Sequence, residues 1–131
     1  MMTPKQKRER KTVITLFTKL MKNPLQTFPP LRGELIAPKK KGVYVIHDPS
    51  GMVVHVGRTP RAKEGMHRRL RAHMSGNSSF THKHLKKDGS KLRSKYQFRC
   101  IVVDDSRHRA LLEAYAAWQL CPEHFGLGEG I

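Results

Sequence analysis

Residues 42–58, which read GVYVIHDPSGMVVHVGR, decide how this chain folds. The runs 42–47 and 52–57 are rich in valine, which favours β-strands. The tetrapeptide between them, Asp48-Pro49-Ser50-Gly51, has proline and glycine at the positions where a tight β-turn accepts them. The stretch therefore predicts a β-hairpin.

The turn also predicts a register for this hairpin. If the first and last residues of the tetrapeptide pair, Tyr44 lies directly opposite His55. Direct cross-strand neighbours share one face of a sheet, with Cβ atoms about 5 Å apart. We expect the phenol and the imidazole to meet near Gly57, which ends the second strand. A merely structural pair on a half-exposed sheet is the alternative interpretation.

Helical patterns bracket the hairpin. Residues 8–22 place their apolar side chains on one helix face, and 23–41 contain four prolines, as a linker would. The other expected elements are helices at 65–75, 80–87 and 107–121 and a strand at 96–103. We expect an α+β fold in which helices flank a small three-stranded antiparallel sheet. The expected organisation is a basic N-terminal helix with its linker in 1–41, a domain in 42–122 and a Gly-rich tail in 123–131.

The composition points to a polyanionic partner. Lys and Arg number 26 against 10 Asp and Glu, a formal net charge of +16, and nucleic acid is the first candidate for such a surplus. No apolar run reaches the roughly 18 residues of a membrane span. The basic N-terminus lacks the apolar segment of a secretory signal. We therefore expect a cytoplasmic protein with no membrane partner.

The basic residues are concentrated in two segments. Residues 58–99 hold thirteen Lys and Arg, and residues 1–22 hold seven. The first segment predicts a surface for a nucleic-acid backbone. The N-terminal helix is either a basic clamp for nucleic acid or an element whose apolar face packs on the core, and the sequence leaves both possibilities open. A generally basic, solvated surface is the bland interpretation of both segments.

The last predicted helix contains a carboxylate in apolar surroundings. From Ala110 to Cys121 the polar residues are Glu113 and Gln119, so we expect a largely buried helix with Trp118 in the core. A buried carboxylate needs a partner, either a metal ion or a cation such as Arg69. A structural salt bridge and a metal site both remain open for Glu113.

The predicted helix at 65–75 carries Arg69 and His73 one turn apart on one face. This face adjoins the helix's apolar stripe, so Arg69 is able to reach back toward the sheet. A guanidinium offers forked donors that suit a phosphate. The alternative is that the arginines of this helix all face solvent, as phosphate contacts or as charges that keep the protein soluble.

Over roughly residues 40–122 the chain resembles the GIY-YIG nuclease domain. The resemblance rests, in chain order, on Gly42-Val43-Tyr44, His55-Val56-Gly57, Arg69-Leu70 with His73, and Glu113 in a Leu-Leu-Glu helix. Two positions depart from the family pattern. His55 stands where the family has its second tyrosine, and no asparagine follows Pro122, where His124 is the substitute we consider.

The resemblance implies a divalent-metal-dependent endonuclease that hydrolyses DNA phosphodiester bonds. It implies that Glu113 anchors Mg²⁺ or Mn²⁺ and that Arg69 stabilises the phosphorane. Tyr44, assisted by His55 or His73, would activate or orient the attacking water. Because a free histidine has a pKa near 6.5, His55 is expected to set an acidic limb in the pH–rate profile.

Two further functions remain as alternatives to the endonuclease. One is a non-catalytic nucleic-acid-binding module that retains the fold, and the other is a basic protein associated with RNA or the ribosome. The sequence leaves open the strandedness of the nucleic acid and the oligomeric state. The residues expected to contact the nucleic-acid backbone are Arg58, Arg61, Arg68, Arg71, Lys83, Lys86 and Lys87.

Overall fold

Strand β2 (Gly42–His47) forms the centre of the sheet, and all six of its residues are buried. In the computed structural model, which describes residues 1–60 and 65–125, β3 (Val53–Arg58) and β4 (Gln97–Val102) pair with β2 in antiparallel orientation. A two-residue strand, β1 (Gln26–Thr27), extends the edge beside β4 and gives the order β1-β4-β2-β3. The expected α+β fold is confirmed, and β1 is a short addition to the three expected strands.

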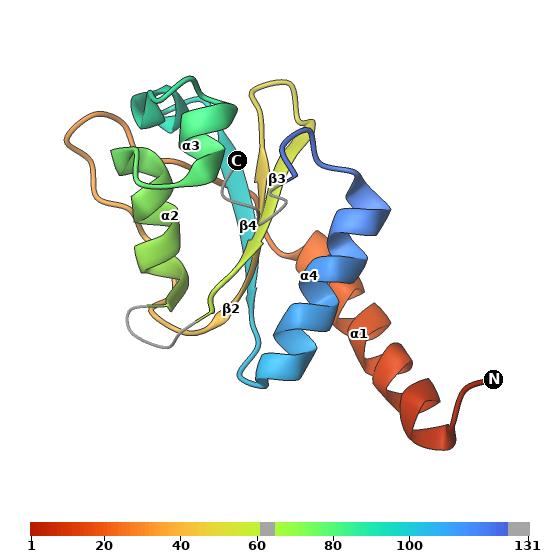
Figure 1. Ribbon diagram of the computed structural model, residues 1–131. Helices are drawn as coiled ribbons and strands as arrows, with labels where there is room; N and C mark the ends of the chain where they lie inside the picture. The colour runs from red at the N-terminus through yellow and green to blue at the C-terminus, as the bar shows by residue number, and fades with distance from the viewer. Residues whose placement is uncertain (61–64, 126–131) are drawn as a thin grey trace.

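Helices cover both faces of this sheet (Figure 1). On one face lie α2 (Gly65–Ser75), α3 (Ser79–Lys83) and the 3₁₀ turn η1 (Gly89–Leu92). On the other face lie α1 (Pro4–Lys22) and α4 (Ser106–Leu120). Two apolar cores result because alternate residues of β2 point to opposite layers.

The hairpin register differs from the one that the turn predicted. Tyr44 pairs with Gly57 and His55 pairs with Ile46, with a bulge between Ile46 and His47. The turn closes by a 2.8 Å backbone hydrogen bond from Asp48 to Met52, one residue later than predicted, and the bulge shifts the pairing by one more. The Asp48 side chain supports this longer turn by accepting hydrogen bonds from the backbone of Ser50 and Met52. Tyr44 and His55 still share a face, as diagonal neighbours with ring centroids 6.0 Å apart.

Helix α1 packs on the body of the protein through its apolar face, which is the second of the two possibilities considered for it. Val13 and Leu20 are buried in the core that α1 forms with α4 and the sheet. The ring of Phe17 meets that of Tyr115 edge-on, with centroids 5.2 Å apart. An exposed ion pair between Glu9 and Arg107, 2.6 Å, also joins the two helices. The apolar face of α1 therefore belongs to the fold.

We expect Leu20→Ala to lower the free energy of unfolding by about 2–5 kcal/mol, because Leu20 is fully buried. Ile14→Ala, on the same helix but 39% exposed, is the matched control and should cost much less. Urea titration of both variants measures the difference. An equally small effect at both positions would contradict the packing of α1 on the core.

Helix α4 is buried on one side only. Leu112 and Ala116 face the sheet, whereas Trp118 is 76% exposed, so the prediction that Trp118 lies in the core is wrong. The side chain of Asp105 accepts a hydrogen bond from the backbone of His108 and caps the helix. The buried guanidinium of Arg109 donates to the carbonyls of Thr59, Val103 and Asp104 and ties the start of α4 to the sheet. None of the helices in the described part of the chain is long and apolar enough to cross a membrane.

Candidate active site

Tyr44 is held against its cross-strand partner Gly57. A Cβ atom on Gly57 would lie 2.4 Å from the Tyr44 hydroxyl oxygen, so only glycine leaves room for the ring. Tyr44 is fully buried, and burial raises the pKa of its phenol to about 12, although the charge and hydrogen bonding of Arg69 act in the opposite direction. The phenol is therefore neutral at physiological pH and needs a neighbour to take its proton.

That neighbour is His73 on α2. Its Nε2 lies 2.7 Å from the Tyr44 hydroxyl, and its Nδ1 lies 2.6 Å from the hydroxyl of Ser78. Burial lowers the pKa of His73 well below its usual value, and the positive charges that His55 and Arg69 can carry lower it further. A neutral imidazole thus faces a neutral phenol. Of the two histidines considered as helpers of Tyr44, His73 is the one in hydrogen-bond contact.

His55 lies beside this pair but bonds elsewhere. Its Nδ1 is 3.1 Å from Nδ1 of His124, and its ring stacks on Phe80 with centroids 4.8 Å apart. Burial lowers the pKa of His55 to about 3, with His124 and Arg69 contributing. The low pKa of His55 argues against the acidic limb near pH 6.5 that the sequence predicted for this residue.

The low pKa of His55 predicts acid-sensitive stability. An unfolded histidine binds a proton near pH 6.5, whereas folded His55 does so only near pH 3. The unfolded state thus binds more protons below pH 6.5, so the free energy of unfolding falls as the pH decreases toward 3. At pH 5 the loss from His55 alone is about 2 kcal/mol.

Denaturant melts at pH 7 and pH 5 check this prediction. His55→Phe keeps the aromatic stack on Phe80 and removes the titrating group, so its stability should fall less between the two values. His82→Gln, at an exposed position on α3, should behave like the unmodified protein. If His55→Phe loses as much stability as the unmodified protein on acidification, His55 is not the source.

Arg69 acts electrostatically on both Tyr44 and Glu113. Its positive charge lowers the pKa of both groups, in each case against a larger rise caused by burial. Its Nε is buried and has no hydrogen-bond partner among the described residues. A buried donor without a partner is costly, and a phosphate oxygen would satisfy it.

Glu113 forms its ion pair with Arg58. Arg69 was the cationic partner that the sequence had offered as an example. The Arg58 Nε donates to Glu113 Oε1 at 3.1 Å, and the two side chains are 38% and 33% exposed. Burial raises the pKa of Glu113, and Arg58 partly offsets this. The carboxylate is thus less buried than predicted and reachable from solvent.

A divalent ion fits Glu113 only with most of its ligands supplied by water. Within residues 1–60 and 65–125, no group of three or more His, Cys, Asp or Glu side chains could hold a metal ion. Mg²⁺ commonly keeps several waters and uses one or two carboxylates. The partly exposed Glu113 carboxylate meets that requirement if it binds the ion while it remains paired with Arg58.

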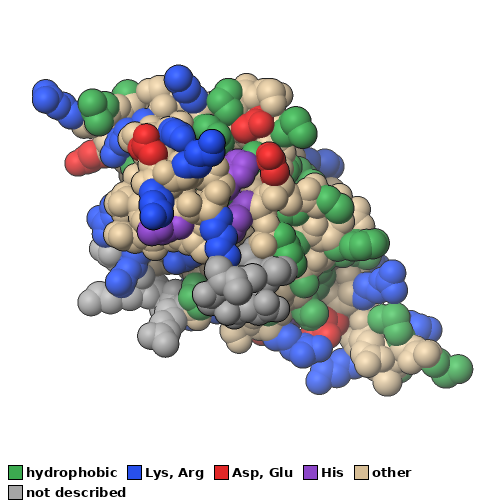
Figure 2. Space-filling view, turned by 45° about the horizontal axis from the view of Figure 1, so that its top comes forward, with side chains coloured by type: hydrophobic (Ala, Val, Ile, Leu, Met, Phe, Trp, Pro, Cys, Tyr) green, Lys and Arg blue, Asp and Glu red, His purple; other side chains and the backbone are tan. Residues whose placement is uncertain are grey.

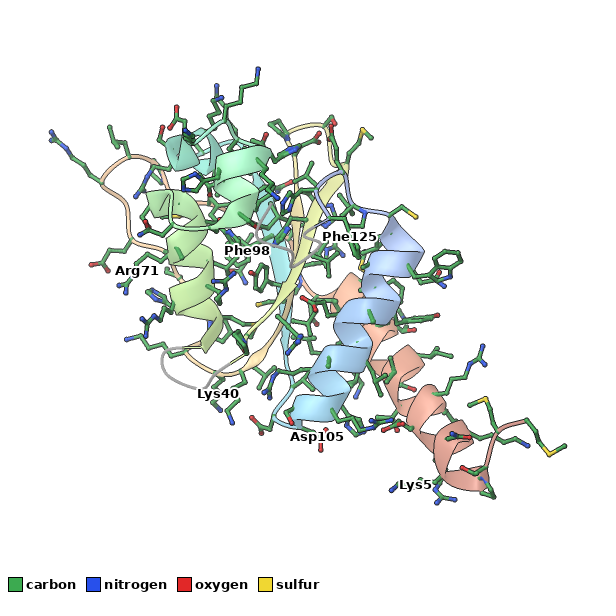
Figure 3. All side chains as sticks on the ribbon, viewed as in Figure 1. Lys5, Lys40, Arg71, Phe98, Asp105 and Phe125 are labelled. Carbon is green, nitrogen blue, oxygen red and sulfur yellow. The ribbon has the colours of Figure 1, made fainter. Side chains whose placement is uncertain are left out.

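Basic side chains are frequent on the face that carries α2 and α3. Figure 2 shows lysines and arginines beside surface histidines there. Figure 3 shows Arg71 on the side of α2 away from the sheet. Arg61 lies outside the described residues, and Arg58 is engaged with Glu113. The exposed members of the expected contact set are Arg68, Arg71, Lys83, Lys86 and Lys87.

Sequence reasoning missed two hydroxyl groups next to His73. Ser78 caps α3, and Thr81 on the same helix is fully buried. Residues 76–79 had the composition of an ordinary loop, so nothing marked Ser78 as a partner of a histidine on the preceding helix. The signal available was a serine shortly before the helix expected at 80–87, because serine is a preferred N-cap residue.

The fold was compared with known proteins. No protein-family model matches the sequence, and no curated protein matches it either. Among solved structures, the magnesium-bound GIY-YIG N-terminal endonuclease domain of UvrC from Thermotoga maritima is similar, with a TM-score of 0.52 and 21% identity over 70% of this chain and 90% of that one. A point mutant of the same domain aligns over 95% of this chain and 99% of its own, with a TM-score of 0.52 and 18% identity. The chain therefore has the GIY-YIG fold, as the motifs at Tyr44, His55, Arg69 and Glu113 had suggested.

Proposed function

We propose that this protein is a divalent-metal-dependent endonuclease that hydrolyses DNA phosphodiester bonds. The observation that carries the proposal is the buried Tyr44–His73 pair, 2.7 Å apart, beside an arginine whose Nε has no partner in the described structure. Glu113 supplies a carboxylate from the opposite layer. The similar UvrC domain is described as bound to its catalytic divalent cation, magnesium, which supports the same type of ion here.

The residues divide the reaction among them. Tyr44 accepts a proton from the attacking water while its own hydroxyl proton passes to His73 Nε2. The water oxygen forms a bond to phosphorus, the bond from phosphorus to the leaving oxygen breaks, and the leaving oxygen takes a proton from solvent water. Arg69 donates to the non-bridging oxygens as charge develops there. Glu113 would hold Mg²⁺ or Mn²⁺, which supplies charge stabilisation when bound.

The charge distribution supports a nucleic-acid substrate. Arg68 is exposed on α2, which carries His73, and Lys83 is exposed on α3, which Ser78 caps. Backbone phosphates near the site would therefore meet positive charge. Such contacts release counterions. With about six phosphate contacts, affinity should fall by roughly a thousandfold between about 50 and 200 mM salt.

The proposal is tested by incubating the purified protein with labelled single-stranded, duplex and forked DNA in Mg²⁺, Mn²⁺ or EDTA. We expect cleavage of at least one DNA that requires the metal and decreases with salt. Binding without cleavage of any DNA would favour the non-catalytic module. Preferential binding of RNA with no cleavage would favour the RNA-associated alternative.

A further inference from the structure

We propose that the hydroxyls of Ser78 and Thr81 fix the tautomer of His73 and thereby set the direction of proton transfer from Tyr44. Both are positioning residues, since they contact His73 and not the reacting atoms. The consequence for catalysis rests on the proposed function, whereas the tautomer itself does not. The three side chains form one buried hydrogen-bonded chain that joins α2 to α3.

The hydrogens of this chain can be assigned one by one. The Thr81 hydroxyl lies 2.5 Å from the backbone carbonyl of His73, and a carbonyl only accepts, so Thr81 donates there. Thr81 Oγ1 also lies 3.0 Å from Ser78 Oγ. Since the Thr81 proton is already committed, Ser78 must donate in that contact.

The Ser78 oxygen is then left with acceptor capacity only. It accepts from the backbone N–H of Thr81 at 3.1 Å. Its remaining contact is with His73 Nδ1 at 2.6 Å, so Nδ1 must carry a hydrogen and donate it. In a neutral imidazole the other nitrogen is then bare, and His73 Nε2 accepts from the Tyr44 hydroxyl.

The opposite tautomer would block the proposed proton transfer. If Nε2 carried the hydrogen, it would donate to Tyr44 and could not accept the phenol proton. Ser78 and Thr81 are 7% and 0% exposed, so water competes little for their hydroxyls. The low pKa of His73 keeps the ring neutral, which is the state in which tautomers differ. The chain therefore keeps Nε2 free to receive the phenol proton.

Nuclear magnetic resonance of protein labelled with ¹⁵N-histidine reads the tautomer directly. At pH 7 we expect His73 to show a protonated Nδ1 and a bare Nε2, assigned by loss of its signals in His73→Gln. An Nε2–H tautomer in the unmodified protein would overturn the proposal, whether or not the protein cleaves DNA. Because this spectrum needs no cleavage, it separates failure of the tautomer assignment from failure of the proposed function.

Variants test the role of each hydroxyl. In Thr81→Val the Ser78 proton loses its acceptor and can turn to His73 Nδ1, so we expect the Nε2–H signal to grow and kcat to fall by roughly 10²-fold with KM nearly unchanged. Thr81→Ser keeps a hydroxyl and should restore both readouts. Ser79→Ala, at the exposed neighbouring position, is the matched control and should change neither. The signals of the other histidines show whether Thr81→Val is folded. An unchanged His73 tautomer in the folded variant would refute the role of Thr81.

Discussion

Glutamine in place of Glu113 should abolish metal-dependent cleavage while the protein stays folded. The amide keeps the size of the side chain but removes the negative charge, so a divalent ion loses the one carboxylate that the described site offers. Metal-ion stabilisation of a transition state contributes several kcal/mol, which corresponds to a loss of roughly a thousandfold or more in rate. Single-turnover cleavage at saturating Mg²⁺ or Mn²⁺ measures it.

If Glu113 serves only as a salt-bridge partner, its substitution should change stability and not the cleavage rate. Its pair with Arg58 is about one-third exposed, so breaking it should cost only about 0–1 kcal/mol of stability. Arg58→Gln removes the other half of the pair and is the matched control, because it keeps the carboxylate. Near-normal cleavage by Glu113→Gln would rule out the metal-anchoring role, and a large drop in melting temperature would point to a structural one.

The location of the hairpin was predictable from sequence, but its register was not. Proline and glycine between two valine-rich runs mark a turn whichever residues pair across it. The register depends on where the turn closes and on the bulge beside it, and the Asp48 carboxylate supports the longer turn by accepting bonds from two backbone N–H groups. Whether an Asp side chain does so depends on competing partners that a single sequence does not show.

Burial of α4 was overestimated for a related reason. An apolar helix predicts burial, but the sheet covers only the side of Leu112 and Ala116 and leaves Trp118 in solvent. The packing of helices and sheet into layers decides how many sides of a helix are covered. The helical periodicity of a sequence does not predict this number. For the same reason the sequence offered Arg69 as one possible cationic partner of Glu113, whereas in the structure Arg58 at the end of β3 pairs with it.

The candidate site was predictable where it follows helical or strand periodicity. Arg69 and His73 lie one turn apart on α2, and His73 meets Tyr44 because both face the same layer. The Ser78–Thr81 hydroxyl chain depends on how α3 docks against α2. That contact is tertiary, so local sequence patterns did not indicate it.

Phenylalanine in place of Tyr44 should lower the single-turnover rate by roughly 10²–10⁴-fold, the range for loss of a general acid–base group. The ring keeps its packing across Gly57, so substrate binding should change little. The rate falls because the variant has no phenol that can pass a proton from the attacking water to His73 Nε2. The buried Nε2 also loses its partner, which should cost about 1–3 kcal/mol of stability.

Tyr115→Phe is the matched control for this loss, since Tyr115 packs edge-on against Phe17 in the other layer. It should cleave at the normal rate. The pH profile adds a second discriminator, because burial raises the pKa of Tyr44 to about 12 and lowers that of His73 well below its usual value. A neutral phenol–imidazole pair predicts no acidic limb near pH 6.5 in the unmodified protein. If Tyr44→Phe cleaves at the normal rate, proton transfer does not pass through this pair. A limb near pH 6.5 that survives in His55→Phe would instead contradict the lowered pKa of His73.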